Sequence, residues 1–341
     1  AHSGLLTVED FSAFRASVEE PVVTDYRGIT VHKCGPWTQG PVLLQSLNLI
    51  EQFDVRSMRR NSADYIHTVV ECMKLAYADR EFYYGDPKFV PVPLDRLLGK
   101  DYAAERARLV DPAVASMQLR PGGREPISAE GIADVNAAVD ASPNPPHGDT
   151  TKLEVIDKAG NMVSATPSGG WLTASPVIPQ MGFPLGTRGQ MFSLVEGHPN
   201  CLAPGKRPRS TLTPSLATRE GRPMLSFGSP GGDSQDQWAL QFLLNVVEFG
   251  MSLQQAVEAP TFWSRHWPDS FYPRSARPGA LMIETRVAKR VRDELAGRGH
   301  KVEAPGAWAG GNTLAAAIDS GTGILSAAAS PRLDPAYAGG F

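Results

Sequence analysis

The chain contains 341 residues, which is enough for one large domain or two ordinary ones. Hydrophobic residues make up 42% and charged residues 20%, a balance typical of globular rather than disordered proteins. The formal net charge of −3 and the lack of a basic stripe argue against nucleic-acid binding as the main function. No apolar run approaches the roughly 18 residues of a membrane span, so no membrane partner is predicted.

The cysteines and the first residues bear on the cellular compartment. Cys34, Cys72 and Cys201 are widely spaced, odd in number and without histidine partners at metal-binding spacing. We therefore expect three free thiols, with Cys72 on a helix, and neither a disulfide framework nor a structural zinc site, which favours a reducing compartment. Residues 1–4 show no signal peptide. The prediction is a cytoplasmic protein, or a periplasmic one if a signal lies upstream of this sequence.

Residues 1–110 are predicted to be mainly helical. Thr7 can cap a first helix with Asp10 as its capping-box partner, and Phe11 and Phe14 supply an apolar stripe that we expect in the core. Residues 26–32 alternate like a short strand.

Two longer helices and a linker follow. Pro41 favours the start of one helix, and Ser62 favours the start of another that runs to about Arg80. Residues 111–149 are rich in Pro, Gly, Ser, Ala and Asn, and the run at 142–146 is compatible with neither a helix nor a central strand. This composition indicates an exposed linker that is suited to cleavage.

From Thr150 onward the pattern changes to hairpins mixed with helices, which indicates antiparallel sheets covered by helices. A hairpin is expected at 153–157 and 162–166, followed by a Gly/Pro-rich loop region over 167–215. The remaining expected elements are a strand at 224–228, a helix at 234–249, a strand at 281–284, a helix at 285–299, and a hairpin at 314–318 and 324–328.

The junction between the linker and the first hairpin is the strongest chemical signal. The linker ends at His147-Gly148-Asp149, and an alternating strand begins directly after Thr150. Cleavage between Asp149 and Thr150 would give a threonine with its own base, because an α-amine has a pKa of about 7.7–8.0. The nearby His147 could assist the cleavage or be merely solvated.

Two further segments could serve such a reaction. In the run 228–232, GSPGG, adjacent glycines before a helix can present N–H groups to an oxyanion, although a tight strand-to-helix turn explains the same residues. In the run 204–214, Ser210 and Thr211 lie beside a basic cluster, which fits a site for a substrate carboxylate or a polar surface turn. The histidines show no metal-ligand spacing, and no metal or organic cofactor is predicted.

The chain resembles the γ-glutamyltransferase (glutathione hydrolase) family of N-terminal-nucleophile hydrolases from about Leu5 to its C-terminus. The resemblance is carried, in order, by 5–10 (LLTVED), 25–28 (DYRG), 77–80 (YADR), 85–87 (GDP), 149–151 (DTT), 157–161 (DKAGN), 204–208 (PGKRP) and 228–232 (GSPGG). It implies an α+β fold with a four-layer αββα sandwich. Residues 1–149 would form the C-terminal part of a large subunit that lacks its N-terminal part, and residues 150–341 would form the small catalytic subunit.

The same resemblance assigns roles to the reacting groups. Thr150 would be the nucleophile, released by self-cleavage after Asp149, with its freed amine as the base. Gly231 and Gly232 match the glycines of the oxyanion hole. The reaction would convert a small-molecule amide through an acyl-enzyme, which water or an amine acceptor then resolves.

Substrate-binding positions carry over with departures from the family pattern. Ser210 and Thr211 match a hydroxyl pair for the substrate α-carboxylate, and Ser168 matches a hydroxyl close to the nucleophile. Lys152 stands where the family commonly has histidine. An arginine that grips the glutamyl carboxylate would lie in the missing N-terminal segment, which we therefore expect as a partner.

A second departure concerns the substrate ammonium. The family holds this group with an acidic residue, but the matching stretch at 185–192 contains no carboxylate, and Met191 falls about where the acid would be. Arg188 lies in the same stretch, and Gly170 replaces an asparagine. A buried ammonium facing Met191 and Arg188 would lack its counter-charge, at a cost of several kcal/mol.

Three hypotheses follow from the sequence. The first is a self-cleaved threonine amidohydrolase or acyltransferase resembling γ-glutamyltransferase. The second keeps this chemistry but places a small non-γ-glutamyl amide, such as an oxamate-like compound, against Arg188 and Met191. The third is an uncleaved, inactive fragment that acts as a binding module.

Overall fold

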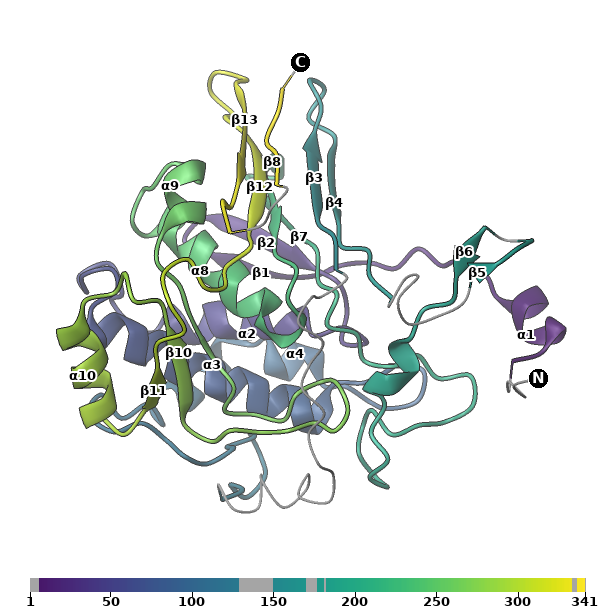
Figure 1. Cartoon of the computed structure of the whole chain (residues 1–341), viewed down its shortest axis with the longest axis horizontal. Helices are drawn as coiled ribbons and strands as arrows, with labels where there is room; N and C mark the ends of the chain where they lie inside the picture. Colours follow the sequence, from purple (N-terminus) through teal and green to yellow (C-terminus); the bar gives the residue numbers. More distant parts are fainter. Residues whose placement is uncertain (1–5, 129–149, 170–176, 181, 333–335, 341) are drawn as a thin grey trace.

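The structure is a computed structural model that describes residues 6–128, 150–169, 177–180, 182–332 and 336–340. The part before the linker contains five helices and one hairpin among the described residues (Figure 1): α1 (Val8–Ala13), β1 (Val22–Tyr26), β2 (Ile29–Lys33), α2 (Pro41–Ile50), α3 (Ala63–Tyr83), α4 (Leu94–Leu97) and α5 (Lys100–Ala107). None of the described helices is long and apolar enough to cross a membrane.

The part after residue 149 begins with two hairpins, β3 (Leu153–Ile156) with β4 (Met162–Ala165) and β5 (Val177–Ile178) with β6 (Phe183–Pro184). Two short 3₁₀ helices, Arg188–Met191 and Gly232–Ser234, lie at the candidate active site. The other elements are β7 (Ser215–Arg219), β8 (Arg222–Gly228), α8 (Gln235–Val247), α9 (Leu253–Glu258), β9 (Phe262–Ser264), β10 (Ala280–Ile283), α10 (Lys289–Gly297), β11 (Lys301–Glu303), β12 (Leu314–Ile318) and β13 (Leu325–Ala329).

A six-stranded antiparallel sheet unites both parts of the chain, in the order β1-β2-β7-β8-β12-β13. Strand β2 comes before the linker and pairs with β7, which comes after it, with Val31 opposite Ala217. Strand β8 pairs with β12, with Gly228 opposite Leu314. The sheet therefore carries the end of β8 to the position where the glycine loop begins.

Helices cover one face of this sheet, and the β3–β4 hairpin covers the other. Along β8, Leu225 and Phe227 belong to the apolar core shared with α2, α3 and α8, whereas Ser226 points to the opposite face and bonds Glu154 of β3. Figure 1 shows the hairpin rising beside the β12–β13 pair. The described residues thus form an α/β protein with antiparallel sheets, and the fourth layer of an αββα sandwich stays a prediction.

Local sequence signals located most of the helices and hairpins. Thr7 and Asp10 form the predicted capping box, and the hydroxyl of Ser62 caps α3 as expected. Cys72 lies buried on α3, and all three thiols are free. The predicted strand at 26–32 was misplaced, because Arg27 and Gly28 form the turn of the β1–β2 hairpin.

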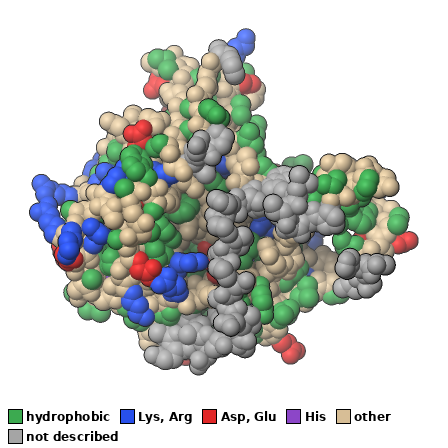
Figure 2. Space-filling view, viewed as in Figure 1, with side chains coloured by type: hydrophobic (Ala, Val, Ile, Leu, Met, Phe, Trp, Pro, Cys, Tyr) green, Lys and Arg blue, Asp and Glu red, His purple; other side chains and the backbone are tan. Residues whose placement is uncertain are grey.

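The expectation that α1 packs into the core was wrong. Phe11 is 42% exposed and Phe14 is 74% exposed, and no residue of the helix is buried. Figure 1 shows α1 at the edge of the molecule, away from the helix layer, and Figure 2 shows hydrophobic side chains at that edge. The periodic pattern specifies a helical face but not the partner that would cover it.

Candidate active site

Thr150 lies directly before β3 and contacts the segment that follows β4. Its Oγ1 is 3.0 Å from the Oγ of Ser168. The backbone N–H of Thr151 donates to the carbonyl of Pro167 at 2.9 Å. The pairing of the hairpin therefore continues past its last strand residues and holds Thr150 against Ser168.

Arg188 extends this contact toward the glycine loop. It begins the 3₁₀ helix Arg188–Met191, and its Nη2 donates to the same Ser168 hydroxyl that contacts Thr150. The Cζ of Arg188 lies 5.6 Å from the ring centroid of Phe271. The edge of that ring lies 3.3 Å from the point where a Cβ on Gly232 would stand. A continuous set of contacts thus joins the predicted nucleophile to the predicted oxyanion loop.

The glycine loop has a backbone that only glycine adopts freely. Gly231 has φ +125°, and a Cβ at this position would lie 2.5 Å from Cζ3 of Trp238. Gly232 has φ +55° and opens the short 3₁₀ helix that leads into α8. A turn of this kind can present N–H groups at the start of a helical segment, where such groups favour negative charge.

Asp233, the residue after Gly232, anchors the glycine loop to neighbouring segments. Its carboxylate accepts from the backbone N–H of Ser270 at 2.8 Å and forms an ion pair with the fully buried Arg80. Burial by itself raises the pKa of Asp233, but Arg80 and the Ser270 hydrogen bonds lower it below its usual value. Gln39 adds a bond to the carbonyl of Gly232 at 3.3 Å. Sequence inspection missed this anchor because Arg80 and Gln39 are far away along the chain.

A second carboxyl group near the loop titrates unusually. Burial, together with the charge of Asp233, raises the pKa of Asp269 to about 7. The Asp269 carboxylate accepts from the backbone N–H of Phe271 at 2.9 Å. Its charge therefore lies next to the residue whose ring faces Gly232. Perturbed carboxyl groups are common in functional sites. Asp269 could not be identified from the sequence, because Asp233, whose charge shifts its pKa, is far away along the chain.

Ser210 and Thr211 differ in their surroundings. Two backbone hydrogen bonds hold Ser210: its N–H donates to the carbonyl of Trp37 at 2.9 Å, and its carbonyl accepts from the N–H of Gln39 at 2.8 Å. The Oγ1 of Thr211 is buried and has no hydrogen-bond partner among the described residues. Buried hydroxyl groups are nearly always paired. The missing partner fits the predicted role in holding a substrate carboxylate, which stays a prediction.

Other predicted site residues are less informative. Met191 is fully buried, and its carbonyl accepts from Asn200 Nδ2 at 2.8 Å, so its contact with a substrate stays a prediction. Asp149, His147 and Gly170 lie outside the described residues.

Lys152 forms a buried ion pair with Glu154. The distance from Lys152 Nζ to Glu154 Oε1 is 2.6 Å, and the two side chains are 0% and 2% exposed. Burial lowers the pKa of Lys152 and raises that of Glu154, while their mutual attraction opposes both shifts. Residue 152 lies directly before the predicted strand at 153–157, and the sequence pattern indicated no partner for its ammonium group.

One buried group of potential metal ligands lies apart from this site. His67, Glu71 and His300 bring ligand atoms within 4.8 Å of one another. However, Glu71 already pairs with Lys74 at 2.6 Å and with Arg120 at 3.1 Å. These two cations occupy the carboxylate, so the cluster is better explained as a buried hydrogen-bond network than as a metal site.

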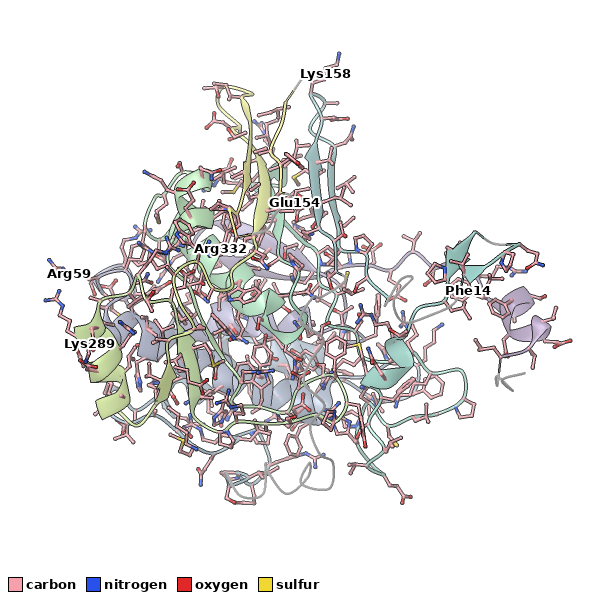
Figure 3. The ribbon with its side chains drawn as sticks, in the orientation of Figure 1. Phe14, Arg59, Glu154, Lys158, Lys289 and Arg332 are labelled. Atoms are coloured by element: carbon pink, nitrogen blue, oxygen red, sulfur yellow. The ribbon has the colours of Figure 1, made fainter. Side chains whose placement is uncertain are left out.

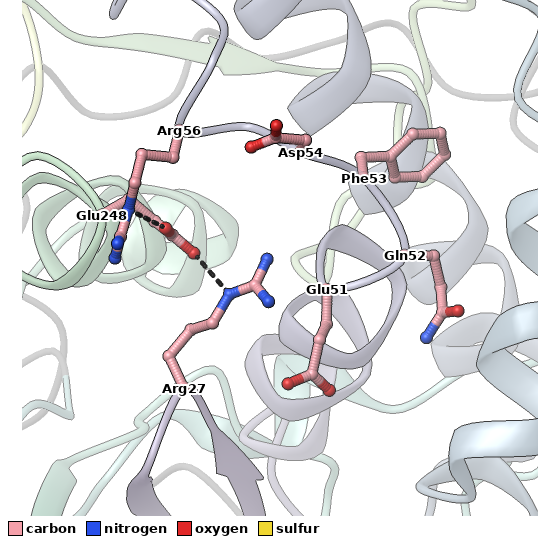
Figure 4. A pocket seen from close by; sticks show the side chains of 7 residues that line it. All are labelled: Arg27, Glu51, Gln52, Phe53, Asp54, Arg56 and Glu248. Carbon is pink, nitrogen blue, oxygen red and sulfur yellow. Dashed lines mark hydrogen bonds and ion pairs between the residues drawn. The ribbon is translucent and has the colours of Figure 1, made fainter.

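A surface pocket near the C-terminal end of α8 is also a poor candidate for catalysis (Figure 4). In it, Arg27 and Arg56 both pair with Glu248, at 3.1 and 3.3 Å, beside Glu51 and Asp54. A 13-residue helix is about 20 Å long, so this pocket lies far from the glycine loop at the start of α8. Glu51 of this pocket also pairs with Lys100 at 2.6 Å, so ion pairs within the protein occupy two of the three carboxylates.

The chain is similar to several known proteins of one family. The model of the γ-glutamyltranspeptidase family matches residues 1–340. A glutathione hydrolase-like YwrD proenzyme from Bacillus subtilis (strain 168) is 32% identical over 98% of this chain and 58% of its own length. The solved structure of LmbA2991HD is 49% identical, with a TM-score of 0.86, over 97% of this chain and 57% of that one. A cephalosporin acylase from Bacillus halodurans is 29% identical, with a TM-score of 0.77, over 97% and 55%.

The chain therefore belongs to the γ-glutamyltranspeptidase family. This family includes relatives described as glutathione hydrolases and as acylases, so membership by itself leaves the substrate open. The chain spans just over half the length of the relatives it matches.

Proposed function

We propose that this protein is an amidohydrolase or acyltransferase that is cleaved between Asp149 and Thr150 and then uses Thr150 as its nucleophile. The supporting observation is the contact of Thr150 with Ser168 at 3.0 Å, linked through Arg188 and Phe271 to the loop at Gly232. Relatives named as proenzymes make processing of a precursor a consistent expectation.

The mechanism needs only groups that cleavage would bring together. The freed amine of Thr150 takes the hydroxyl proton while Oγ1 attacks the amide carbonyl. N–H groups of Gly231 and Gly232 stabilise the oxyanion. The proton then passes to the leaving amine as the C–N bond breaks. Water or an acceptor amine attacks the resulting ester and gives a proton to the Thr150 amine, which passes it to Oγ1 as the ester C–O bond breaks and the acyl group leaves.

Intact mass and N-terminal sequencing test this proposal directly. We expect two pieces, the second of which begins at Thr150. A Thr150→Ala variant should remain one chain without amidase activity, whereas Thr150→Ser, which keeps a hydroxyl and an amine, should be cleaved and partly active. A single wild-type species of 36.7 kDa without amidase activity would instead support the binding-module hypothesis.

For the substrate, we propose a small amide whose acyl group carries a negative charge. Arg188 supports this choice, because its guanidinium lies against the hydroxyl that contacts Thr150. An acyl carboxylate held there would need no ammonium partner, which agrees with Met191 at the position of the family's acidic residue.

An Arg188→Met change tests this substrate class. Loss of a charge-assisted hydrogen bond costs about 1.5–3 kcal/mol, so kcat/KM for an anionic acyl amide should fall about 10- to 100-fold. A neutral acyl amide of the same leaving group should be affected much less, and Arg188→Lys should lose less activity than Arg188→Met. Robust turnover of a γ-glutamyl anilide with weak turnover of the other amides would contradict the proposal.

A further inference from the structure

Lys152, directly before β3, and Glu154 on β3 form a buried ion pair that the proposed reaction does not use. Burying both charges costs several kcal/mol per ion before their attraction is counted, so an apolar pair would fill this space more cheaply. Lys152 Nζ also donates to Ser164 Oγ at 2.6 Å and to the carbonyl of Ala165 at 3.3 Å. The ammonium group therefore joins β3 to the whole end of β4.

The stem of Lys152 lies against the beginning of the glycine loop. A Cβ on Gly228 would stand 2.4 Å from Lys152 Cε and 3.1 Å from its Nζ. Gly228 is the last residue of β8 and the first of the loop that continues to Gly231 and Gly232. Glycine at position 228 leaves room for the Lys152 side chain. The start of the glycine loop therefore packs closely against the segment that leads into β3.

Glu154 makes the matching contact one step along the strand. Its carboxylate accepts from the hydroxyl of Ser226 on β8 and from Ser164 at 3.2 Å. Figure 3 labels Glu154 near the base of the hairpin and Lys158 at its tip. The pair thus fastens β3 to β8 next to both Thr150 and the loop.

We propose that the Lys152–Glu154 pair is a positioning device, which holds Thr150 in register with the N–H groups of the glycine loop. This inference rests on the proposed function of Thr150. Lys152 is a positioning residue rather than a catalytic one, because it acts through the strand that carries the nucleophile. Catalytic groups must be held within about 0.5 Å of their working geometry, and an error of 1 Å can cost about 100-fold in rate.

The first test replaces the ammonium group. A Lys152→Met variant keeps most of the stem but leaves Glu154 without its partner. We expect kcat per cleaved molecule to fall about 100-fold while KM changes less than threefold, and we expect slower cleavage of the precursor. The matched control is Lys158→Met, because Lys158 is exposed at the tip of the same hairpin and should leave both rates unchanged.

The second test uses the close packing of Lys152 against Gly228. It can be carried out even if the Lys152→Met variant does not fold. Gly228→Ala should lower kcat by displacing Lys152, and Lys152→Ala should lower it by removing the stem. In the double variant the new methyl occupies the vacated space, so the two losses should overlap rather than multiply. Circular dichroism and the thermal midpoint of each variant separate loss of rate from loss of folded protein.

Either of two results would overturn the inference: wild-type kcat in folded Lys152→Met, or losses that multiply in the double variant. Failure of the proposed function is distinguishable, because it would appear as amidase activity in Thr150→Ala. If Thr150→Ala is inactive while Lys152→Met is fully active, only the positioning role is wrong.

Discussion

Gly231 and Gly232 are the positions at which a structural role of the glycine loop can be distinguished from a catalytic one. Gly231 combines φ +125° with close contact to Trp238, so a side chain there would disturb packing as well as chemistry. Gly232 has φ +55°, which a side chain tolerates at moderate cost, and its nearest neighbour is Phe271 at 3.3 Å. Gly232 is therefore the better position to examine.

We expect Gly232→Ala to reduce kcat by about 10²–10³-fold, because the displaced backbone N–H no longer faces the oxyanion. The matched control is Gly221→Ala in the β7–β8 turn, where φ is +72° and no atom lies within 4 Å of an added methyl. Both variants should lose about 1–2 kcal/mol of stability, but only Gly232→Ala should lose activity. Equal activity in the two variants, measured as kcat with folded protein, would favour the tight-turn explanation.

At the scale of elements, buried histidines fasten helices and strands to their neighbours in an uncharged form. His266 Nε2 donates to the carbonyl of Gln118 at 3.1 Å, and its Nδ1 accepts from the N–H of Gly279 at 3.0 Å. Burial, with the charge of Lys74, lowers the pKa of His266 to about 3. Burial likewise lowers the pKa of His300 to about 2.

These shifts predict a loss of stability in mild acid. Below pH 6.5 the unfolded chain binds protons at both histidines, whereas the folded protein stays unprotonated until about pH 3. Each histidine should therefore lower the free energy of unfolding by about 1.4 kcal/mol per pH unit, or about 2 kcal/mol between pH 6.5 and 5. Urea unfolding across this range measures the slope. In His266→Gln and His300→Gln the slope should become shallower by one proton each, and an unchanged slope would contradict the assignment.

For the whole molecule, the junction at Thr150 divides the sequence but not the structure. Strands β2 and β7 pair across it, and a buried charge cluster crosses it as well. Glu81 of α3 binds Arg209 at 2.7 Å and Arg274 at 2.6 Å. Burial would raise the pKa of Glu81, but Arg209, Arg80 and Arg274 together lower it well below its usual value.

The two pieces of the cleaved protein should therefore remain one particle. Gel filtration without denaturant should give a single peak that contains both pieces, and separation should require conditions that unfold the sheet. Elution of the pieces as independent folded species would contradict the prediction.

Removing the charge of Glu81 should weaken this junction. A Glu81→Gln change leaves buried arginines without their counter-charge, which costs about 3–5 kcal/mol. The thermal midpoint should fall by several degrees. Glu294→Gln is the matched control, because its exposed pair with Arg298 at 2.8 Å should contribute less than 1 kcal/mol.

The sequence by itself determined the features that depend on neighbouring residues. The capping residues Thr7 and Ser62, the β3–β4 hairpin and the glycine run before α8 were all predictable, because caps, turns and strand alternation are short-range. The candidate nucleophile at Thr150 was identifiable for the same reason, since a linker meets a strand there.

Only the tertiary structure decided which distant groups meet. It left the apolar face of α1 uncovered, paired β2 with β7, where no strand had been predicted, and placed Lys152 against both Glu154 and Gly228. It also gave Asp233 and Asp269 opposite pKa shifts: burial, with the charge of Asp233, raises the pKa of Asp269, whereas Arg80 and hydrogen bonds outweigh burial and lower that of Asp233. Such contacts join residues many positions apart, and their energies depend on burial, which no local pattern encodes.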